Sequence, residues 1–306
     1  LLVLKRTLDM ISNKKIIDCD LLIIGGGVAG MAASLFAANR GISSVHIGNT
    51  ATLSFFTGLI DLLSVHPVEE KKIWQNPWKG IESLINDNPD HPYTRCSTDL
   101  IRNAIDEFAL FLKTQNMAYH YQKDINETVF TPLGTKRLFY CVPETFVNGS
   151  KALRENQDCL IIDIDNLKGF DTGQTLKTLK LKWPGLRIEK GKFSDLGKEQ
   201  YPEQLARSLE NPTILNQLAK IIKPHVKSAQ AVGIPSILGI KNPDLLKNNL
   251  EKKIGVPVFE VPTIPPCTAG IRIRESFERE LPDKGVKTFY QQKISKVSSG
   301  DDLRVD

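Results

Sequence analysis

A glycine-rich bend between an apolar strand and a helix constrains this chain more than any other feature. Gly25, Gly27 and Gly30 fit the pattern G-x-G-x-x-G inside the stretch DLLIIGGGVAGMAASLFAANRGISSVHIGN, residues 20–49. The apolar run before the glycines predicts a buried parallel strand, the small-residue segment after them predicts a helix, and ISSVHIGN predicts a second strand. This order within about 30 residues predicts a βαβ unit of the Rossmann type, which binds a nucleotide or a flavin.

Each glycine of the bend has its own predicted role. Gly25 permits the tight turn, Gly27 lets a phosphate approach the backbone, and Gly30 lets the helix pack against the strand. The first amides of the helix and its partial positive charge then point at the phosphate. The alternative is a purely structural glycine turn. The predicted cofactor contacts on this bend are Gly25, Gly26, Gly27, Val28, Ala29 and Gly30.

The end of the second strand departs from the usual dinucleotide pattern. An Asp or Glu normally hydrogen-bonds the ribose hydroxyls there, but this chain has Gly48 and Asn49. Asn49 is the predicted contact, and its neutral amide binds a hydroxyl less strongly than a carboxylate does. No arginine stands there to bind a 2′-phosphate, so the pattern argues against NADP and weakens the support for FAD and NAD.

Length and composition indicate a globular protein with room for two domains. The chain has 306 residues, 41% of them hydrophobic and 25% charged, and its net charge of +5 is too small to suggest nucleic acid. The five cysteines form no Cys-x-x-Cys pair, so no zinc or iron–sulfur site is predicted, and a reducing cytoplasm is expected. No apolar run reaches the roughly 20 residues that a membrane-spanning helix needs, and no secretory signal is predicted.

The order of predicted elements places an α/β insertion inside the flavin domain. We expect residues 18–66 and 262–306 to form a discontinuous flavin-binding domain, and residues 67–261 to form an inserted α/β domain for substrate or a partner. Alternating apolar runs, helical periodicity and turn residues predict the elements of the insertion and of the return. These are helices at 98–115, 172–183 and 242–254, helical segments in 203–223 broken at Pro212, a hairpin at 127–140, strands at 159–165, 186–191, 228–238 and 255–262, and a helix, a strand and a hairpin from 271 onwards.

Four stretches make the chain resemble one known family. SFFTGLIDLLSVHP (54–67), HPYTRCSTDLIRNAIDEFALF (91–111), FTPLGTKR (130–137) and VPTIPPCTAGIRI (261–273) look like the corresponding segments of the B subunit of the anaerobic glycerol-3-phosphate dehydrogenase family, in the same order. The resemblance extends from about residue 18 to the end, and it is far more specific than the glycine bend alone.

The resemblance implies a subunit of a three-part enzyme. That enzyme oxidises glycerol 3-phosphate to dihydroxyacetone phosphate and passes electrons to membrane quinone in anaerobic respiration. In this family FAD is held by the A subunit, iron–sulfur clusters are held by the membrane-associated C subunit, and the B subunit is ascribed FMN. FMN has no adenosine, which suits the missing acid, and FAD is the alternative. The expected location is the cytoplasm, or the cytoplasmic face of the inner membrane through a partner.

The family also implies cofactor contacts just after the second strand. Ser54, Thr57 and Gly58 stand where related flavoproteins wrap the cofactor, and Asp61 is a further candidate. The alternative is that this apolar segment is simply a buried helical turn. The family continues beyond the point that corresponds to Asp306, with a glycine-rich region that closes the flavin site, so the flavin domain of this sequence is predicted to be incomplete.

The predicted chemistry is removal of a hydride from a secondary alcohol, which needs a proton acceptor and a cation for the substrate phosphate. No catalytic residue is assigned. Weak candidates are Lys136 and Arg137 beside the hairpin turn, and His91 as a base. His66 is another possible base, and Arg272 with Arg274 forms a second cationic pair, for which the exposed edge of a helix or strand is the slightly favoured alternative.

Two other functions remain open at this stage. One is a non-catalytic electron-relay or assembly subunit that binds a flavin or nothing, because no base is evident in the sequence. The other is a separate FAD- or NAD-dependent oxidoreductase that acts on another small metabolite.

Overall fold

The computed structural model divides the chain into two compact units. One unit, here called the glycine-loop unit, contains Leu1–Thr50 and Glu280–Asp306, and the large unit contains Ala51–Arg279. We describe each unit by itself, and the functional domain boundaries predicted at residues 66 and 262 remain a prediction. The residues described are 17–170, 172–180, 183–193, 200–294, 296–298 and 304–305.

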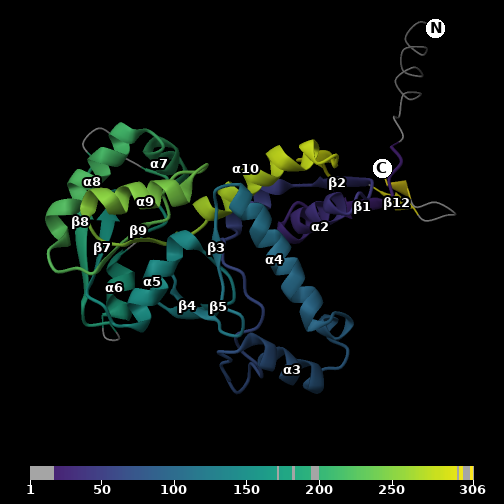
Figure 1. Cartoon of the computed structure of the whole chain (residues 1–306), viewed down its shortest axis with the longest axis horizontal. Coiled ribbons are helices and arrows are strands. Elements are labelled where there is room, and N and C mark those ends of the chain that lie inside the picture. Colours follow the sequence, from purple (N-terminus) through teal and green to yellow (C-terminus); the bar gives the residue numbers. More distant parts are fainter. Residues whose placement is uncertain are drawn as a thin grey trace, which may run out of the picture. The chain divides into compact units, whose positions relative to one another are not determined.

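The glycine-loop unit contains the predicted βαβ arrangement. Its three-stranded sheet is parallel, with β2 in the middle between β1 and β11, and α2 connects β1 to β2 (Figure 1). The bounds are β1 (Leu21–Ile24), α2 (Val28–Asn39), β2 (Ser44–Gly48) and β11 (Lys287–Tyr290). The apolar positions Met31 and Leu35 of α2 are almost fully buried. The Rossmann-like fold class predicted from the glycine bend is therefore confirmed.

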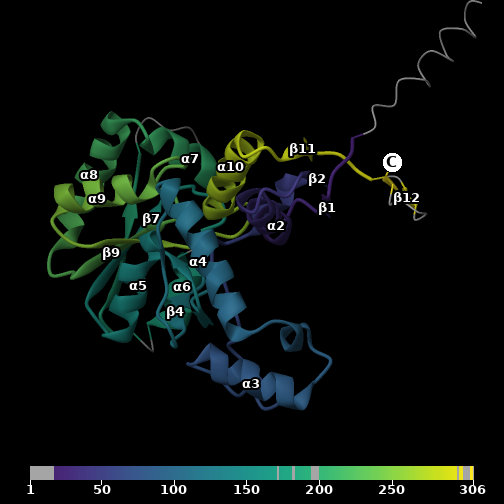
Figure 2. The ribbon, with the colours of Figure 1, turned by 45° about the vertical axis from the view of Figure 1, so that its right-hand side comes forward.

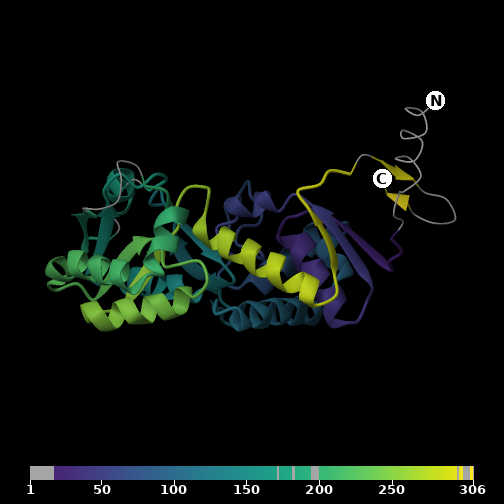
Figure 3. The same ribbon diagram turned by 90° about the horizontal axis from the view of Figure 1, so that it is seen from above.

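The end of α2 also follows from the sequence. Gly41 has a φ of +68°, in the left-handed region that only glycine adopts easily. The amides of Gly41 and Ile42 donate to the carbonyls of Ala38 and Ala37, which closes the last turn of the helix. Further along the unit, β12 (Val297–Ser298) and β13 (Arg304–Val305) pair antiparallel as the predicted hairpin (Figure 3), whose turn lies outside the described residues.

The large unit is built on a second parallel sheet. Its four strands lie in the order β10-β9-β7-β8, and right-handed connections place α8 and α9 on one face and α6 on the other (Figure 1). The central strand β7 is buried from end to end except at Asp163, as expected of a parallel strand covered on both faces. The elements are α5 (Glu144–Arg154), β7 (Cys159–Ile164), α6 (Thr172–Leu179), β8 (Leu186–Gly191), α7 (Pro202–Leu209), α8 (Pro212–Val226), β9 (Ala231–Pro235), α9 (Pro243–Ile254) and β10 (Val258–Val261).

The segment before this sheet forms helices and two short antiparallel pairs. The predicted hairpin is β4 paired with β5, and Gly134 turns it with a φ of +76°. Helices α3 and α4 follow each other along the chain (Figure 2), and Ser97 caps α4 by accepting a hydrogen bond from the amide of Leu100. The bounds are η1 (Thr50–Phe55), α3 (Pro77–Asp87), η2 (Pro92–Arg95), α4 (Thr98–Thr114), β3 (Tyr119–His120), β4 (Glu127–Phe130), β5 (Lys136–Phe139) and β6 (Val142–Pro143).

The long helix α10 (Thr268–Asp283) begins three residues before the predicted start at Ile271 (Figure 3). Its Phe277 packs against Phe108 and Phe111 of α4, with ring centroids 5.8 and 4.6 Å apart. Within the described part of the chain, no helix combines the length and the apolar composition needed to cross a membrane.

A buried ion pair connects α10 to the second sheet. Both guanidinium Nη atoms of Arg272 donate to the carboxylate of Glu260 on β10, at 2.7 and 2.8 Å, and Arg272 Nε donates to the carbonyl of Gly239 at 2.8 Å. The same carboxylate accepts hydrogen bonds from the amide of Leu238 at 2.7 Å and from the hydroxyl of Thr145 on α5 at 2.8 Å. One pair of charges thus holds α5, β10, α10 and the loop after β9.

This arrangement corrects the interpretation of Arg272 as an exposed edge residue. Arg272 is 3% exposed and Glu260 is 2% exposed, so both charges are removed from water. Burial alone raises the pKa of the Glu260 carboxyl, but the charge of Arg272 and the four hydrogen bonds outweigh burial and leave that pKa below its ordinary value. Arg272 is therefore occupied by the protein and does not form a substrate clamp with Arg274.

We expect Arg272→Met to lower the free energy of unfolding by about 3–5 kcal/mol, because it leaves the Glu260 carboxylate buried without its partner. Urea-induced unfolding followed by circular dichroism measures the loss. The matched control is Arg274→Met on the same helix, whose carboxylate neighbour Glu275 is 4.0 Å away, and which should cost no more than about 1 kcal/mol. Equal losses in the two variants would contradict the assignment.

Candidate functional site

The glycine loop, residues 25–30, has the backbone that its sequence predicts. Gly25 has a φ of +128°, and its amide donates to the carbonyl of Ile47 on β2 at 2.8 Å. A Cβ at Gly30 would lie 1.9 Å from the carbonyl oxygen of Gly25, so only glycine lets α2 start this close to β1. Val28 and Ala29 form the first turn of α2 between these positions.

Gly27 differs from its neighbours because the space where its side chain would lie is empty of protein atoms. A Cβ at Gly27 would meet no atom within 4 Å, and its φ of −81° suits any residue, so neither backbone strain nor packing requires glycine there. No side chain caps the amides of α2, and no acidic residue occupies its first turn. The open position beside uncapped helix amides fits the terminal phosphate of a cofactor.

The end of β2 explains why the usual acid is absent. A Cβ at Gly48 would lie 2.3 Å from the amide nitrogen of Gly26, and a Cβ at Gly26 would lie 2.4 Å from the carbonyl carbon of Asn49. The two backbones touch, which leaves no space for a side chain at Gly48. Asn49 directly follows this contact, beside Thr50, whose hydroxyl accepts a hydrogen bond from Gln291 Nε2 at 2.9 Å.

His46 supports the glycine loop through a contact with the backbone of Gly25, and the sequence analysis assigns it no role. The side chain is fully buried in β2, its Nε2 lies 2.9 Å from the carbonyl oxygen of Gly25, and its ring meets that of Tyr290 edge-on. A carbonyl only accepts, so Nε2 carries the proton, and among the described residues Nδ1 has no partner. Burial lowers the pKa of His46 and outweighs the raising effect of this hydrogen bond, which keeps the ring neutral.

The predicted contacts after β2 lie in the large unit and pack against the start of α10. The amide of Cys267 donates to the carbonyl of Ser54 at 2.6 Å, and a Cβ at Gly270 would lie 1.9 Å from the carbonyl oxygen of Leu53. The SFFTG and CTAG motifs are thus in direct backbone contact. The Thr268 hydroxyl on the first turn of α10 is buried and has no partner among the described residues.

The three predicted contacts of this segment differ in their hydrogen bonding. The hydroxyl of Ser54 donates to the carbonyl of Ala51 at 2.7 Å, while the hydroxyl of Thr57 has no partner in the described part of the chain. Gly58 has a φ of +82°, and its carbonyl accepts a hydrogen bond from the hydroxyl of Tyr119 at 2.7 Å. Thr57 is therefore the side chain of the three that is best placed to bind a ligand.

One of the weak catalytic candidates, Arg137, lies near a carboxylate. Burial raises the pKa of Asp61, while a hydrogen bond from the Ser64 hydroxyl at 3.1 Å and the charge of Arg137 lower it; burial has the larger effect. Asp61 in turn raises the pKa of Tyr93, after the larger effect of burial. His91 Nδ1 accepts a hydrogen bond from the amide of Tyr93 at 3.2 Å. Asp61 therefore lies near both Arg137 and Tyr93, and His91 contacts the backbone of Tyr93.

The other candidates do not join this group. Lys136 and Arg137 are consecutive residues of β5, so their side chains point to opposite faces of the hairpin and do not form a clamp. His66 Nε2 lies 2.8 Å from an oxygen of Asp87 in a partly exposed pair. Asp61 was considered only as a cofactor contact, because its apolar neighbours in the sequence give no sign that Arg137 lies near it.

A family model described as "FAD binding domain" matches residues 20–293. The match begins at β1 and continues beyond β11, so it includes the glycine loop, both parallel sheets and α10.

Curated proteins that carry the name of the B subunit of anaerobic glycerol-3-phosphate dehydrogenase are also similar to this chain. The protein of Vibrio vulnificus (strain YJ016) is 27% identical over 281 residues, which cover 88% of this chain and 64% of that protein. The protein of Actinobacillus pleuropneumoniae serotype 5b (strain L20) is 28% identical over 285 residues, covering 85% and 64%. That of Pectobacterium atrosepticum is 26% identical, covering 87% and 64%. The chain thus spans about 64% of the length of these relatives.

We expect His46 to make the stability of the protein depend on pH. Its pKa is lowered in the folded state, so the unfolded chain binds the proton more readily. The stability is then fully present above about pH 6.5, the ordinary histidine pKa, and falls as the pH drops below that value towards the folded-state pKa. Urea unfolding between pH 5 and 8 measures the slope, and His46→Leu should flatten it. A variant with an unchanged slope would contradict this role.

Proposed function

This chain belongs to the FAD binding domain family, and from that premise we propose that its glycine loop binds the phosphate of a flavin. The observation that carries the proposal is Gly27, an open glycine beside the uncapped amides of α2, where nothing in the protein requires the side chain to be missing. The amides of residues 27–30 and the partial positive charge of the helix stabilise an anion there. A bound flavin supplies a ring that accepts a hydride from a substrate.

We propose FMN as the flavin of this chain, with FAD as the alternative that the family description favours. The end of β2 supports FMN, because the backbone contact between Gly48 and Gly26 leaves no place for a side chain at residue 48, and residue 49 has a neutral amide in place of the carboxylate that usually hydrogen-bonds an adenosine ribose. Asn49 is the proposed side-chain contact on this strand, and Ser54, Thr57 and Gly58 remain proposed contacts in the large unit.

The proposed activity follows from the names of the relatives. We propose that the chain is part of the B subunit of a quinone-linked anaerobic glycerol-3-phosphate dehydrogenase, which oxidises glycerol 3-phosphate to dihydroxyacetone phosphate. Its proposed partners are an iron–sulfur C subunit, which associates with the membrane, and an FAD-containing A subunit. The proposed location is the cytoplasm or, through the iron–sulfur partner, the cytoplasmic face of the inner membrane.

Asp61 and Arg137 are the residues best suited to act on such a substrate. A carboxylate with a raised pKa accepts the hydroxyl proton more readily than an ordinary one, and a guanidinium pairs with phosphate oxygens through parallel hydrogen bonds. His91 is the alternative base in the same group, and Lys136 on the opposite face of β5 is not part of it.

A relay or assembly role without substrate chemistry is the second candidate function. The observation that favours it concerns Arg272, the most deeply buried of the candidate cations. Glu260 and Gly239 accept the hydrogen bonds of its guanidinium, so Arg272 cannot bind substrate phosphate. Bleaching of the bound flavin by glycerol 3-phosphate under anaerobic conditions, without partner proteins, separates the two. A flavin that stays oxidised supports the relay.

We expect Gly27→Ala to lower flavin affinity by at least about tenfold, because the added methyl group occupies the space proposed for the phosphate. Its free energy of unfolding should change by less than about 1 kcal/mol, since alanine is tolerated at this φ. Gly48→Ala is the contrasting variant, and its backbone clash should destabilise the fold by about 1–3 kcal/mol or more. Flavin fluorescence titration and urea unfolding measure the two effects, and mass spectrometry of the released cofactor separates FMN from FAD. Full flavin affinity in Gly27→Ala would refute the proposed phosphate site.

We expect Arg137→Ala to raise the KM for glycerol 3-phosphate by about tenfold or more, because a charged hydrogen bond to the phosphate is lost. Lys136→Ala is the matched control, since it removes the same charge from the other face of β5 and should leave KM unchanged. Steady-state assays with a quinone analogue as electron acceptor measure both. Equal effects of the two variants would exclude Arg137 as the specific contact.

A further inference from the structure

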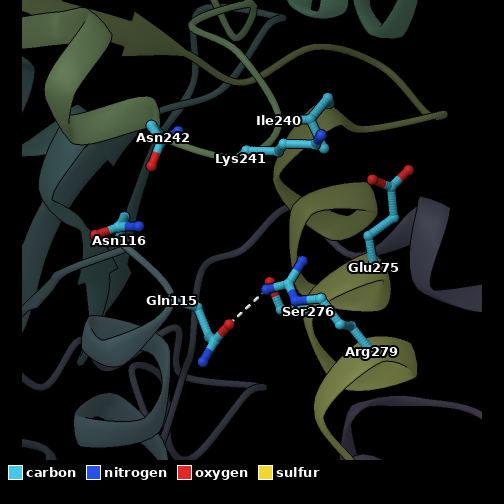
Figure 4. A pocket seen from close by; sticks show the side chains of 8 residues that line it. All are labelled: Gln115, Asn116, Ile240, Lys241, Asn242, Glu275, Ser276 and Arg279. Atoms are coloured by element: carbon cyan, nitrogen blue, oxygen red, sulfur yellow. Dashed lines mark hydrogen bonds between the residues drawn. The ribbon is translucent and has the colours of Figure 1, made fainter.

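A polar pocket of about 210 Å³ lies in the large unit, where the end of α4, the loop before α9 and one side of α10 meet (Figure 4). Asn116 comes from the end of α4, Lys241 and Asn242 come from the loop, and Ser276 and Arg279 come from α10. The pocket has the size of a small ligand rather than of a dinucleotide.

Ser276 is the buried polar group of this pocket. Its residue is 5% exposed, yet within the part of the chain described here its hydroxyl has no hydrogen-bond partner. Serine hydroxyls on helices often donate to the carbonyl four residues earlier, as Ser34 does to Gly30 at 2.9 Å, but Ser276 does not. A buried hydroxyl that faces a pocket without a protein partner points to a ligand that supplies one.

The charges around the pocket favour an anion. The ammonium group of Lys241 has no carboxylate partner among the described side chains. The carboxylate of the pocket, Glu275, is paired with Arg207, which also binds Glu203 at 2.8 Å. Arg279 is held at the wall by the side-chain oxygen of Gln115 (Figure 4). The lining therefore presents the cations Lys241 and Arg279, while its carboxylate, Glu275, is paired with Arg207.

Helix α9 begins beside the pocket, just after Asn242. Its N-cap residue is Asn242, whose side chain does not cap the helix, and Pro243 follows at the first position. The carboxylate of Asp244, in the first turn, accepts a hydrogen bond from the amide of Ala118 at 2.7 Å instead of capping α9. The first turn of α9 thus carries a carboxylate of its own, so cationic side chains rather than this helix end supply the positive charge of the pocket.

The loop that carries Lys241 is preorganised. The amides of Ile240 and Lys241 both donate to the same oxygen of Glu210, each at 2.8 Å. Two residues earlier, Gly239 accepts from Arg272 of the buried ion pair. The backbone is therefore fixed before a ligand arrives, which reduces the entropy lost on binding.

We propose that this pocket binds the phosphate group of a small metabolite, with the Lys241 ammonium and the Ser276 hydroxyl as its ligands. An ammonium from the loop and a hydroxyl from α10 line the same cavity, and both donate hydrogen bonds to an oxyanion. The proposal is independent of flavin binding at the glycine loop.

Isothermal titration calorimetry with inorganic phosphate, glycerol 3-phosphate and glycerol tests the proposal. Both phosphates should bind saturably, and neutral glycerol should not. Equal affinity for the two phosphates assigns the site to the phosphate group alone, while tighter binding of the ester shows that the pocket also contacts the tail, and either result supports the proposal. Binding of glycerol alone as strongly as of glycerol 3-phosphate would overturn it.

Single substitutions test which residues of the pocket bind phosphate. Lys241→Ala should weaken phosphate binding by about tenfold and Ser276→Ala by about threefold or more. Lys252→Ala at the other end of α9 and Ser208→Ala on α7 are the matched controls and should bind as the unaltered protein does. Gly27→Ala should also bind phosphate normally, which separates this pocket from the glycine loop. Unchanged binding in both Lys241→Ala and Ser276→Ala, or loss of binding in Gly27→Ala, would overturn the proposal.

Discussion

The buried pair between Arg272 and Glu260 is the interaction on which the architecture of the large unit depends. Two charges inside a protein are tolerated only when each is matched by an opposite charge and by hydrogen bonds. Here the guanidinium has three bonds to oxygen and the carboxylate has four donors, drawn from α5, α10 and the loop after β9. The pair therefore fixes where α10 begins relative to β10, and that position brings the motif at Cys267–Gly270 against residues 53–56.

Two carboxylates fix the backbone of the loop after β9. Glu260 accepts from the amide of Leu238 at one end, and Glu210 accepts from the amides of Ile240 and Lys241 at the other. A loop whose amides are directed inward has few backbone conformations available. Its side chains can then differ in character without altering the path of the chain, which is how scaffolds carry binding groups.

Local sequence patterns predicted the βαβ unit, the β4–β5 hairpin and helices α4 and α6–α10, because each is determined by residues close together in the chain, but they did not predict α3 or α5. The G-x-G-x-x-G spacing and the apolar runs around it define both strands and α2 without reference to the rest of the fold. Pairings between distant segments were not predictable in this way. Arg272 alternates with isoleucines in the sequence, and nothing in that pattern shows that Glu260 would face it in the core.

The candidate site likewise has one part that the local sequence determines and another part that depends on the tertiary fold. The conformation of the glycine loop follows from its own residues, but the support from His46 depends on the pairing of β1 with β2, and the group formed by Asp61, Arg137 and Tyr93 depends on tertiary folding. The absence of an acid at the end of β2 was visible in the sequence. Its cause, the contact of the Gly48 backbone with Gly26, required coordinates.

The proposed recognition at the glycine loop relies on main-chain amides, because residues 25–30 contain no side chain with a polar atom. Deletion of side-chain atoms, as at Val28, removes no polar contact from such a surface, so a survey limited to deletions would miss residues 25–30. The loop becomes visible to mutagenesis only when atoms are added to it, as in Gly27→Ala, so the requirement on these residues is a limit on size rather than a demand for a particular functional group.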